Sequence, residues 1–121
     1  MNVFDASALL AYLQGETGAD QVEKALENSG ACGAANWSEV AQKIRAHGKN
    51  WDLARSLLMS YGIKVESVTL DDAEWAARRW ARGEHLSLAD RLCLALGTRL
   101  DAVVWTADQA WGTGSRIRQI R

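Results

Sequence analysis

Apolar and polar positions follow two different periods along this chain, separated by short breaks rich in glycine, serine and asparagine. Short apolar or alternating stretches predict strands, whereas apolar residues that recur every three or four positions predict helices. The expected strands are Met1–Phe4, Ala31–Ala35, Ile63–Val68, Ala102–Trp105 and Arg116–Ile120. The expected helices are Ser7–Gln14, Thr17–Asn28, Asn36–Ala46, Asn50–Ser60, Asp71–Arg82 and Ser87–Arg99, followed by a turn at Ala107–Trp111.

The alternation of strands with helices predicts how these elements assemble. It favours a parallel sheet with helices on both faces, so we predict an α/β fold, namely a three-layer α/β/α sandwich with a central, mostly parallel sheet. The chain has 121 residues and contains no internal repeat or low-complexity segment, so residues 1–121 are expected to form a single domain. Helices 36–46 and 50–60 are expected to pair as a hairpin, and Gly83 is expected to end the helix over 71–82.

Four acidic residues lie at similar points in this pattern, where an apolar stretch gives way to a helix. They are Asp5, Glu39, Asp90 and Asp108. Ligands of open parallel sheets bind in the crevice beyond the carboxyl ends of the strands, so we expect the four acids to meet in one pocket. Each acid alone fits a helix cap equally well, because Asn36 with Glu39 and Ser87 with Asp90 have the spacing of capping boxes. Capping, however, does not require four separate segments to converge.

Several carboxylates around one pocket require a cation. Two carboxylates about 5 Å apart repel by roughly 3 kcal/mol at an effective dielectric near 20. Oxygen ligands suit Mg²⁺ or Mn²⁺, whereas zinc is disfavoured because His47 and His85 are the only histidines. A bound divalent cation activates water and polarises a phosphoryl oxygen, so the acids predict hydrolysis of a phosphodiester.

The segments that carry the four acids resemble the PIN-domain ribonucleases. They read VFDASALLAYL, NWSEV, HLSLADRLCLAL and VVWTADQAW, and together they are most similar to the VapC-type toxins of bacterial toxin–antitoxin pairs. In that family an Asp after the first strand, a Glu at the start of a later helix and two further Asp residues hold one or two Mg²⁺ ions. The resemblance therefore implies a PIN-like sandwich, with catalytic and metal-binding roles for Asp5, Glu39, Asp90 and Asp108.

The resemblance also implies an activity and partners. It implies an endoribonuclease that cuts selected tRNA or ribosomal RNA with a metal-activated water, and a homodimer neutralised by a cognate antitoxin protein. Ser7 and Thr106 lie near the first and fourth acids and are expected to orient a carboxylate or a metal-bound water, although both also fit hydroxyls at helix starts. Two apolar faces are expected to form ordinary core or to receive an antitoxin helix: Leu9, Leu10, Leu13 and Leu53, Leu57, Leu58.

Charge and aromatic residues indicate where RNA would bind. The net charge is −1, but residues 78–121 hold 8 Arg against 4 Asp or Glu. The clustered arginines fit either a solvated face or contacts to RNA phosphates: Arg78, Arg79, Arg82, Arg116, Arg118 and Arg121. Trp105 and Trp111 are expected in the core, whereas Trp80, beside Arg79 and Arg82, is the better candidate for stacking on an unpaired base.

Other features of the sequence predict an ordinary intracellular protein. The chain has no apolar run long enough to span a membrane and no signal-like N-terminal pattern, so we expect a cytoplasmic protein without membrane contact. Cys32 and Cys93 match no zinc or CxxC spacing and are expected to be buried free thiols.

Three other functions are alternatives to the nuclease. The first is a noncatalytic PIN-like regulator that binds RNA or protein, which the presence of all four acids disfavours. A phosphoacceptor receiver domain needs a late lysine, but the last lysine here is Lys64. A phosphatase of the haloacid-dehalogenase type needs a second Asp two residues after Asp5, where this chain has Ser7.

Overall fold

The computed structural model describes residues 1–114 and 116–121. Its strands are β1 (Asn2–Phe4), β2 (Gly30–Gly33), β3 (Lys64–Glu66), β4 (Val103–Thr106) and β5 (Ile117–Gln119). Its helices are α1 (Ala6–Gln14), α2 (Ala19–Leu26), α3 (Ala34–Ala46), α4 (Trp51–Ser60), α5 (Leu70–Arg79) and α6 (Leu88–Arg99), with a short 3₁₀ helix η1 (Gln109–Trp111).

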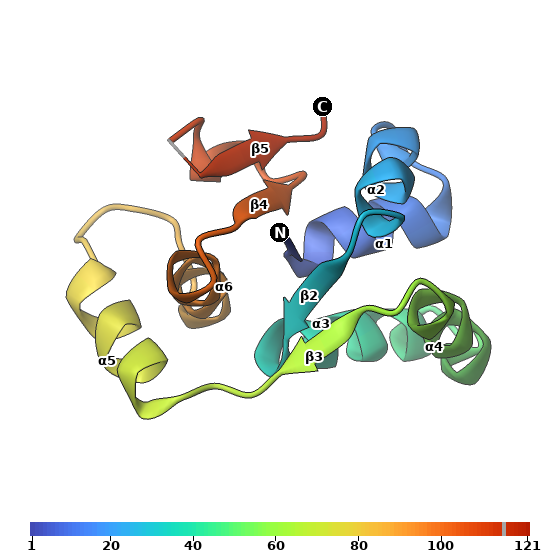
Figure 1. Cartoon of the computed structure of the whole chain (residues 1–121), viewed down its shortest axis with the longest axis horizontal. Helices are drawn as coiled ribbons and strands as arrows, with labels where there is room; N and C mark the ends of the chain where they lie inside the picture. The colour runs from blue at the N-terminus through green and yellow to red at the C-terminus, as the bar shows by residue number, and fades with distance from the viewer. Residues whose placement is uncertain (115) are drawn as a thin grey trace.

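The five strands form one sheet in the order β3-β2-β1-β4-β5, and every neighbouring pair is parallel (Figure 1). Phe4, the last residue of β1, pairs with Trp105 near the end of β4, so the carboxyl ends of the central strands lie at one edge. Helices connect successive strands, as parallel pairing requires. The predicted α/β class with a parallel sheet is confirmed.

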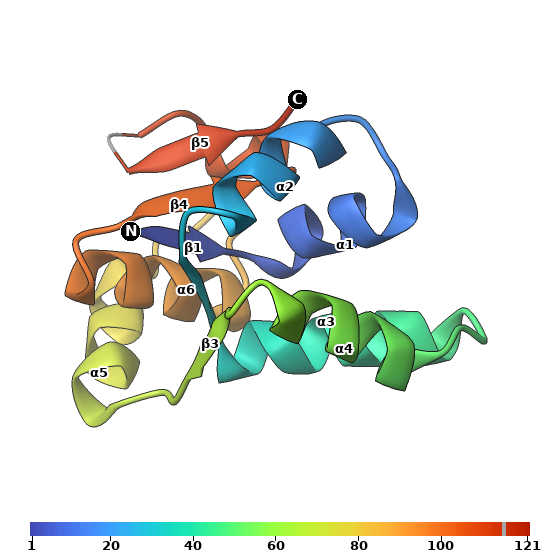
Figure 2. The same ribbon diagram turned by 45° about the vertical axis from the view of Figure 1, so that its right-hand side comes forward.

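Helices cover both faces of the sheet, with a hydrophobic core on each side (Figures 1 and 2). Val3 belongs to one core and the next residue, Phe4, to the other, because successive side chains of a strand point to opposite faces. The Phe4 core is filled from α1, α2, α3 and α4, whereas the Val3 core is filled mainly from α6, with Trp75 of α5 packed against it. This arrangement is the expected three-layer sandwich, and α3 and α4 form the expected helical hairpin (Figure 2).

The position of α6 follows from its short connection to β4. Only residues 100–102 separate Arg99 from Val103, so α6 runs antiparallel to the strands and begins at their carboxyl edge. Close packing holds it there, because a Cβ atom added to Gly97 would lie 2.3 Å from Cγ2 of Val104. The first residues of α6 are therefore placed beside the ends of β1 and β4.

Several predicted boundaries were wrong. Helix α3 begins at Ala34 rather than Asn36, with Gly33 as its N-cap, so β2 is shorter than expected. Helix α5 ends at Arg79 because Trp80 adopts an extended conformation (φ −60°, ψ 136°), and Gly83 lies in the following turn instead of ending the helix. Helix α2 is also shorter than residues 17–28. Within residues 1–114 and 116–121, no helix has both the length and the hydropathy of a membrane span.

Candidate active site

Asp5 is the most deeply buried acid of the predicted set. It follows β1 directly, its backbone N–H donates to the carbonyl of Trp105 (3.1 Å), and its side chain caps α1 by accepting from the backbone N–H of Ala8 (2.8 Å). Only 3% of Asp5 is exposed. The end of the strand and the start of the helix thus fix this carboxylate in one position.

Two hydroxyl groups join Asp5 to the end of β4. Ser7 Oγ lies 2.8 and 2.9 Å from the two carboxylate oxygens of Asp5, and Thr106 Oγ1 donates to Oδ2 of Asp5. The same two hydroxyls accept from the backbone N–H groups of Ala107 (2.9 Å) and Asp108 (3.0 Å), respectively. Ser7 and Thr106 therefore contact Asp5 and the segment leading to Asp108, which is the placement that an orienting role requires.

Glu39 reaches the site from the second turn of α3. Its Oε1 accepts from Nδ2 of Asn36 (3.2 Å), which also donates to the carbonyl of Ala89 at the start of α6 (3.2 Å). The predicted capping box of Asn36 with Glu39 is wrong, because Asn36 lies inside the helix and is 1% exposed. Asn36 instead links Glu39 to α6, and sequence reasoning missed this role.

Asp90 and Asp108 both lie at helix starts. Asp90 and Ser87 form the expected capping box of α6, in which Asp90 Oδ2 accepts from the backbone N–H of Ser87 (2.9 Å). Asp108 caps η1 through Oδ1, which accepts from the N–H of Ala110 (2.9 Å). Capping and convergence are therefore compatible, because each carboxylate uses one oxygen for its helix, and among the described residues the other oxygen makes no hydrogen bond.

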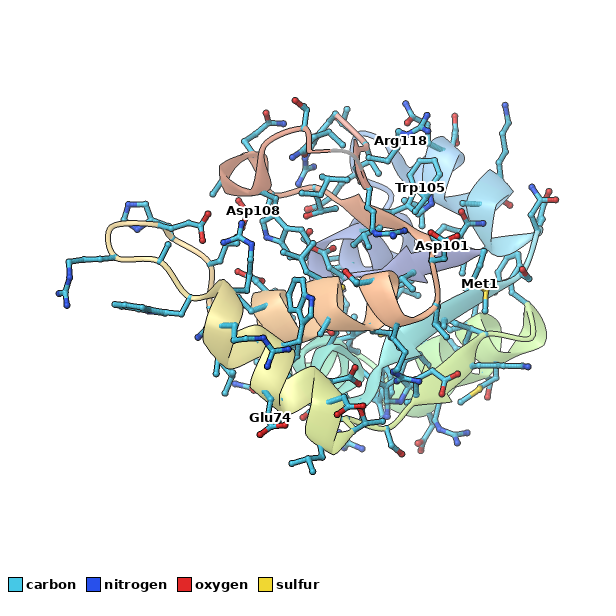
Figure 3. All side chains as sticks on the ribbon, turned by 60° about the vertical axis from the view of Figure 1, so that its left-hand side comes forward. Met1, Glu74, Asp101, Trp105, Asp108 and Arg118 are labelled. Carbon is cyan, nitrogen blue, oxygen red and sulfur yellow. The ribbon has the colours of Figure 1, made fainter. Side chains whose placement is uncertain are left out.

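All four acids line one pocket of about 300 Å³ at the carboxyl edge of the sheet. Figure 3 shows Asp108 at this edge, whereas Met1 and Asp101 mark the opposite edge. The remaining lining residues are Ala6, Ser7, Leu10 and Lys43. Lys43 was not predicted, although its spacing of four residues from Glu39 is the spacing that brings opposite charges together on a helix.

Burial and mutual repulsion make the ionised pocket unfavourable. Burial is the largest cause that raises the pKa of Asp5, to about 6, and the nearby charge of Asp90 adds to it, although hydrogen bonds from Thr106, Ala8 and Ser7 oppose the shift. Burial likewise raises the pKa of Glu39, again with a contribution from Asp90, while Asn36 and Lys43 act in the opposite direction. A cation in this pocket would relieve both penalties.

The chemistry of the donors fits a hard divalent cation. Every acid offers carboxylate oxygens, the ligands that Mg²⁺ and Mn²⁺ prefer. Among the described residues, however, no three His, Cys, Asp or Glu side chains form a group already arranged to hold a metal ion. Mg²⁺ keeps several waters when bound, so a wide ring of carboxylates still matches its needs.

The basic residues of the C-terminal part separate into two groups. Arg116 pairs with Asp101 (2.8 Å), Arg121 lies 3.9 Å from Glu16, and Arg118 lies over the ring of Trp105 (5.8 Å to its centroid). These three belong to the structure around β5. Arg78, Arg79 and Arg82 instead lie at the end of α5 and in the loop that leads to α6.

The core predictions were confirmed for Trp111 and both cysteines, and only in part for Trp105. Trp111 is buried, but Trp105 is only partly buried, and its Nε1 donates to Oδ1 of Asn2 (2.9 Å). Cys32 and Cys93 are buried free thiols.

Comparison with known proteins identifies the class of this fold and site. The family model described as the PIN domain matches residues 3–112, which is most of the chain, and the chain therefore belongs to the PIN-domain family. Over 105 residues it is 35% identical to a VapC ribonuclease of Mycobacterium bovis and to ribonuclease VapC42 of Mycobacterium tuberculosis, covering 78% of this chain and 80% of each relative. Within the family, its relatives are thus VapC ribonucleases of toxin–antitoxin systems, as the sequence motifs predicted.

Solved structures confirm the fold. A chain of a toxin–antitoxin complex from Klebsiella pneumoniae superposes with a TM-score of 0.78 at 20% identity, covering 100% of this chain and 98% of that one. VapC20 of Mycobacterium tuberculosis, described as a toxin that cleaves the sarcin–ricin loop, superposes with a TM-score of 0.69 at 15% identity, covering 95% and 92%.

Proposed function

We propose that this chain is a metal-dependent endoribonuclease toxin that hydrolyses phosphodiester bonds in selected RNA. The observation that carries the proposal is the convergence of Asp5, Glu39, Asp90 and Asp108, from four separate segments, on one pocket. Family membership supports the same activity, because the relatives of this chain are named as ribonucleases. The proposed metal is Mg²⁺, with Mn²⁺ as the alternative.

Each polar residue of the pocket has a specific task in this proposal. Asp5, Glu39, Asp90 and Asp108 would hold the cation, which supplies an activated water and neutralises charge on the phosphoryl oxygen. Ser7 and Thr106 keep the Asp5 carboxylate in one orientation, and Asn36 does the same for Glu39. Lys43 places a positive charge at the pocket, where it lowers the repulsion between the acids and an approaching phosphate.

The proposed RNA substrate is tRNA or ribosomal RNA. Support for ribosomal RNA comes from VapC20, which shares the fold and is described as cleaving the sarcin–ricin loop.

The proposed protein partners are a cognate antitoxin and a second copy of the chain. An apolar groove of about 230 Å³ lies between α1, α3 and α4, lined by Leu13, Ile44, Lys49, Asn50, Leu53, Ala54 and Leu57. Leu53 and Leu57 are 69% and 44% exposed, whereas Leu9 and Leu58 are buried core. The exposed leucines of α4, together with Leu13 of α1, are thus the ones available to an antitoxin helix. The Klebsiella structure, which shares the fold, is described as a toxin–antitoxin complex.

Cleavage of a mixed tRNA and ribosomal RNA preparation tests the nuclease. The wild-type chain should give discrete cuts in Mg²⁺ and none in EDTA, and Asp90→Asn should abolish them. Asp101→Asn is the matched control, because Asp101 is exposed at the opposite edge of the sheet and its left-handed backbone (φ 51°) suits asparagine. Equal behaviour of wild type and Asp90→Asn would contradict the proposal and favour a noncatalytic regulator.

A further inference from the structure

Trp80 is a large aromatic side chain that the fold leaves in solvent. It follows the last residue of α5, and 54% of it is exposed. The other tryptophans named above, Trp75, Trp105 and Trp111, pack against the cores. An exposed indole leaves an aromatic face and its N–H group free to contact another molecule.

The loop from Trp80 to Ser87 is held in a defined conformation. Both guanidinium nitrogens Nη1 and Nη2 of Arg79 bond to Glu84 (2.6 and 3.0 Å), which closes the turn that contains Gly83. Leu86 is buried in the Val3 core. Arg91 of α6 donates to the carbonyl of Ala76 (2.7 Å), which fixes the end of α5. The Trp80 ring is thus presented from a fixed support and loses little entropy when it binds a ligand.

The charge around Trp80 favours a nucleic acid. The Arg82 guanidinium lies 5.5 Å from the centroid of the Trp80 ring, and Arg78 lies two residues before it. The acid of the loop, Glu84, is already paired with Arg79. An aromatic ring flanked by arginines is the combination with which proteins bind a base and its phosphate.

The loop lies on the same side of the molecule as the acidic pocket. It leads directly into Ser87, whose backbone N–H bonds to the Asp90 carboxylate. Figure 3 shows the loop between α5 and α6 projecting beyond the carboxyl edge marked by Asp108, away from Met1 and Asp101. A strand of RNA with its phosphodiester in the pocket would therefore continue toward this loop.

We propose that Trp80 stacks on an unpaired base of the RNA substrate, with Arg82 and Arg78 contacting the adjacent phosphates. The inference rests on the proposed nuclease function and names the side chains outside the pocket that hold the RNA. A base held inside a duplex offers no free face to the indole, so paired RNA is a poor substrate.

Binding of a short, fluorescently labelled RNA strand without internal pairing tests the inference. The Asp90→Asn background in Mg²⁺ prevents cutting during the measurement. Trp80→Ala should weaken binding about 5- to 150-fold, the equivalent of losing one stacked base, whereas Trp80→Phe should keep most of the affinity. Leu70→Ala is the control, because Leu70 is 75% exposed at the other end of α5 and should leave binding unchanged.

The same strand annealed to its complement completes the test. The duplex should bind more weakly than the single strand, and Trp80→Ala should not weaken it further. If wild type cuts RNA but Trp80→Ala binds the single strand as well as its parent, the inference is wrong and the nuclease stands. If wild type neither cuts nor binds RNA, both fail. A Trp80→Ala protein that sediments as a smaller species with unchanged RNA affinity would assign the ring to contact with a second copy and overturn the inference.

Discussion

Asp5 performs two tasks that oppose each other. As the N-cap of α1 it accepts a backbone hydrogen bond, which favours the ionised carboxylate, yet its burial and the charge of Asp90 favour the protonated form. Burial dominates, and the pKa of Asp5 rises to about 6. The protein therefore stores unfavourable electrostatic free energy at one of the residues that would hold the cation.

This stored free energy predicts a pH dependence of stability. Between about pH 4 and pH 6 the folded protein holds a proton on Asp5 that the unfolded chain releases, so the free energy of unfolding should fall as the pH rises through this window. A shift from 3.8 to about 6 corresponds to about 3 kcal/mol. Asp5→Asn caps equally well and should remove this loss in metal-free buffer, as urea unfolding at pH 4.5 and 7 would measure.

The pKa of Glu39 is raised as well, so Glu39 also lowers the stability as the pH rises. The decisive quantity is therefore the loss of unfolding free energy between pH 4.5 and 7, compared between Asp5→Asn and wild type. A variant that loses as much stability as wild type between them would contradict the assignment to Asp5. Added Mg²⁺ should raise the stability of wild type at pH 7 more than that of the variant.

Asn36 is a second residue whose position predicts a measurable effect. Its amide donates to Glu39 and to the carbonyl of Ala89, so Asn36→Asp replaces the donor by a like charge without changing shape. We expect RNA cleavage to fall about 10- to 100-fold, with a higher Mg²⁺ concentration needed for half-maximal rate. Asn28→Asp, in the exposed turn that follows α2, is the control. A lower rate with unchanged Mg²⁺ dependence would contradict a positioning role.

At the residue scale, the sequence was sufficient to predict that the four acids meet in one pocket. It was insufficient to predict which residues contact them there. Asp5, Asp90 and Asp108 could be found because each marks the start of a helix, and Glu39 because it follows within two turns of a strand end. Asn36 and Lys43 could not, because their contacts depend on how α3 is rotated against α6, which tertiary packing decides. Only the four-residue spacing of Glu39 and Lys43 gave a signal in the sequence.

Helices α5 and α6 both begin with a capping box, but only the capping box of α6 contains a residue of the acidic pocket. Thr69 with Asp72 and Ser87 with Asp90 both form complete capping boxes. Ser87→Ala and Thr69→Ala should each cost about 1 kcal/mol of stability. Only Ser87→Ala should also reduce stabilisation by Mg²⁺, because it removes the hydroxyl that accepts from the backbone N–H of Asp90 and so loosens the helix start that carries this carboxylate. Thermal unfolding with and without Mg²⁺ separates these effects, and equal Mg²⁺ responses would show that the cap does not position Asp90.

The element boundaries show what local sequence decides. The capping box of α6 was predictable because both of its partners lie within one turn. The early end of α5 was not, because Trp80 leaves the helical conformation where the chain turns to bury Leu86, a tertiary contact. The start of α3 at Ala34 could not be predicted, because its N-cap, Gly33, has no side chain to mark the position.

At the scale of the whole molecule, charge is distributed to suit a polyanion. The pocket is acidic, whereas Arg78 and Arg82 lie on the loop side, and Arg116 is paired with Asp101 at the far edge. Single-stranded RNA affinity should fall with rising salt, and Arg82→Ala should reduce the slope of log affinity against log salt by about 0.7. Arg116→Ala should leave the slope unchanged. Fluorescence anisotropy over a series of KCl concentrations measures both, and an equal change in the two variants would contradict this division.

The central position of β1 ties the pocket to distant parts of the chain. Asp5 leaves the ribosome 101 residues before Thr106, whose hydroxyl donates to it. Until β4 has emerged and paired with β1, Asp5 lacks this partner and the pocket lacks Asp108. A nascent chain therefore cannot present the complete site, so the proposed nuclease would become competent only after synthesis has passed β4.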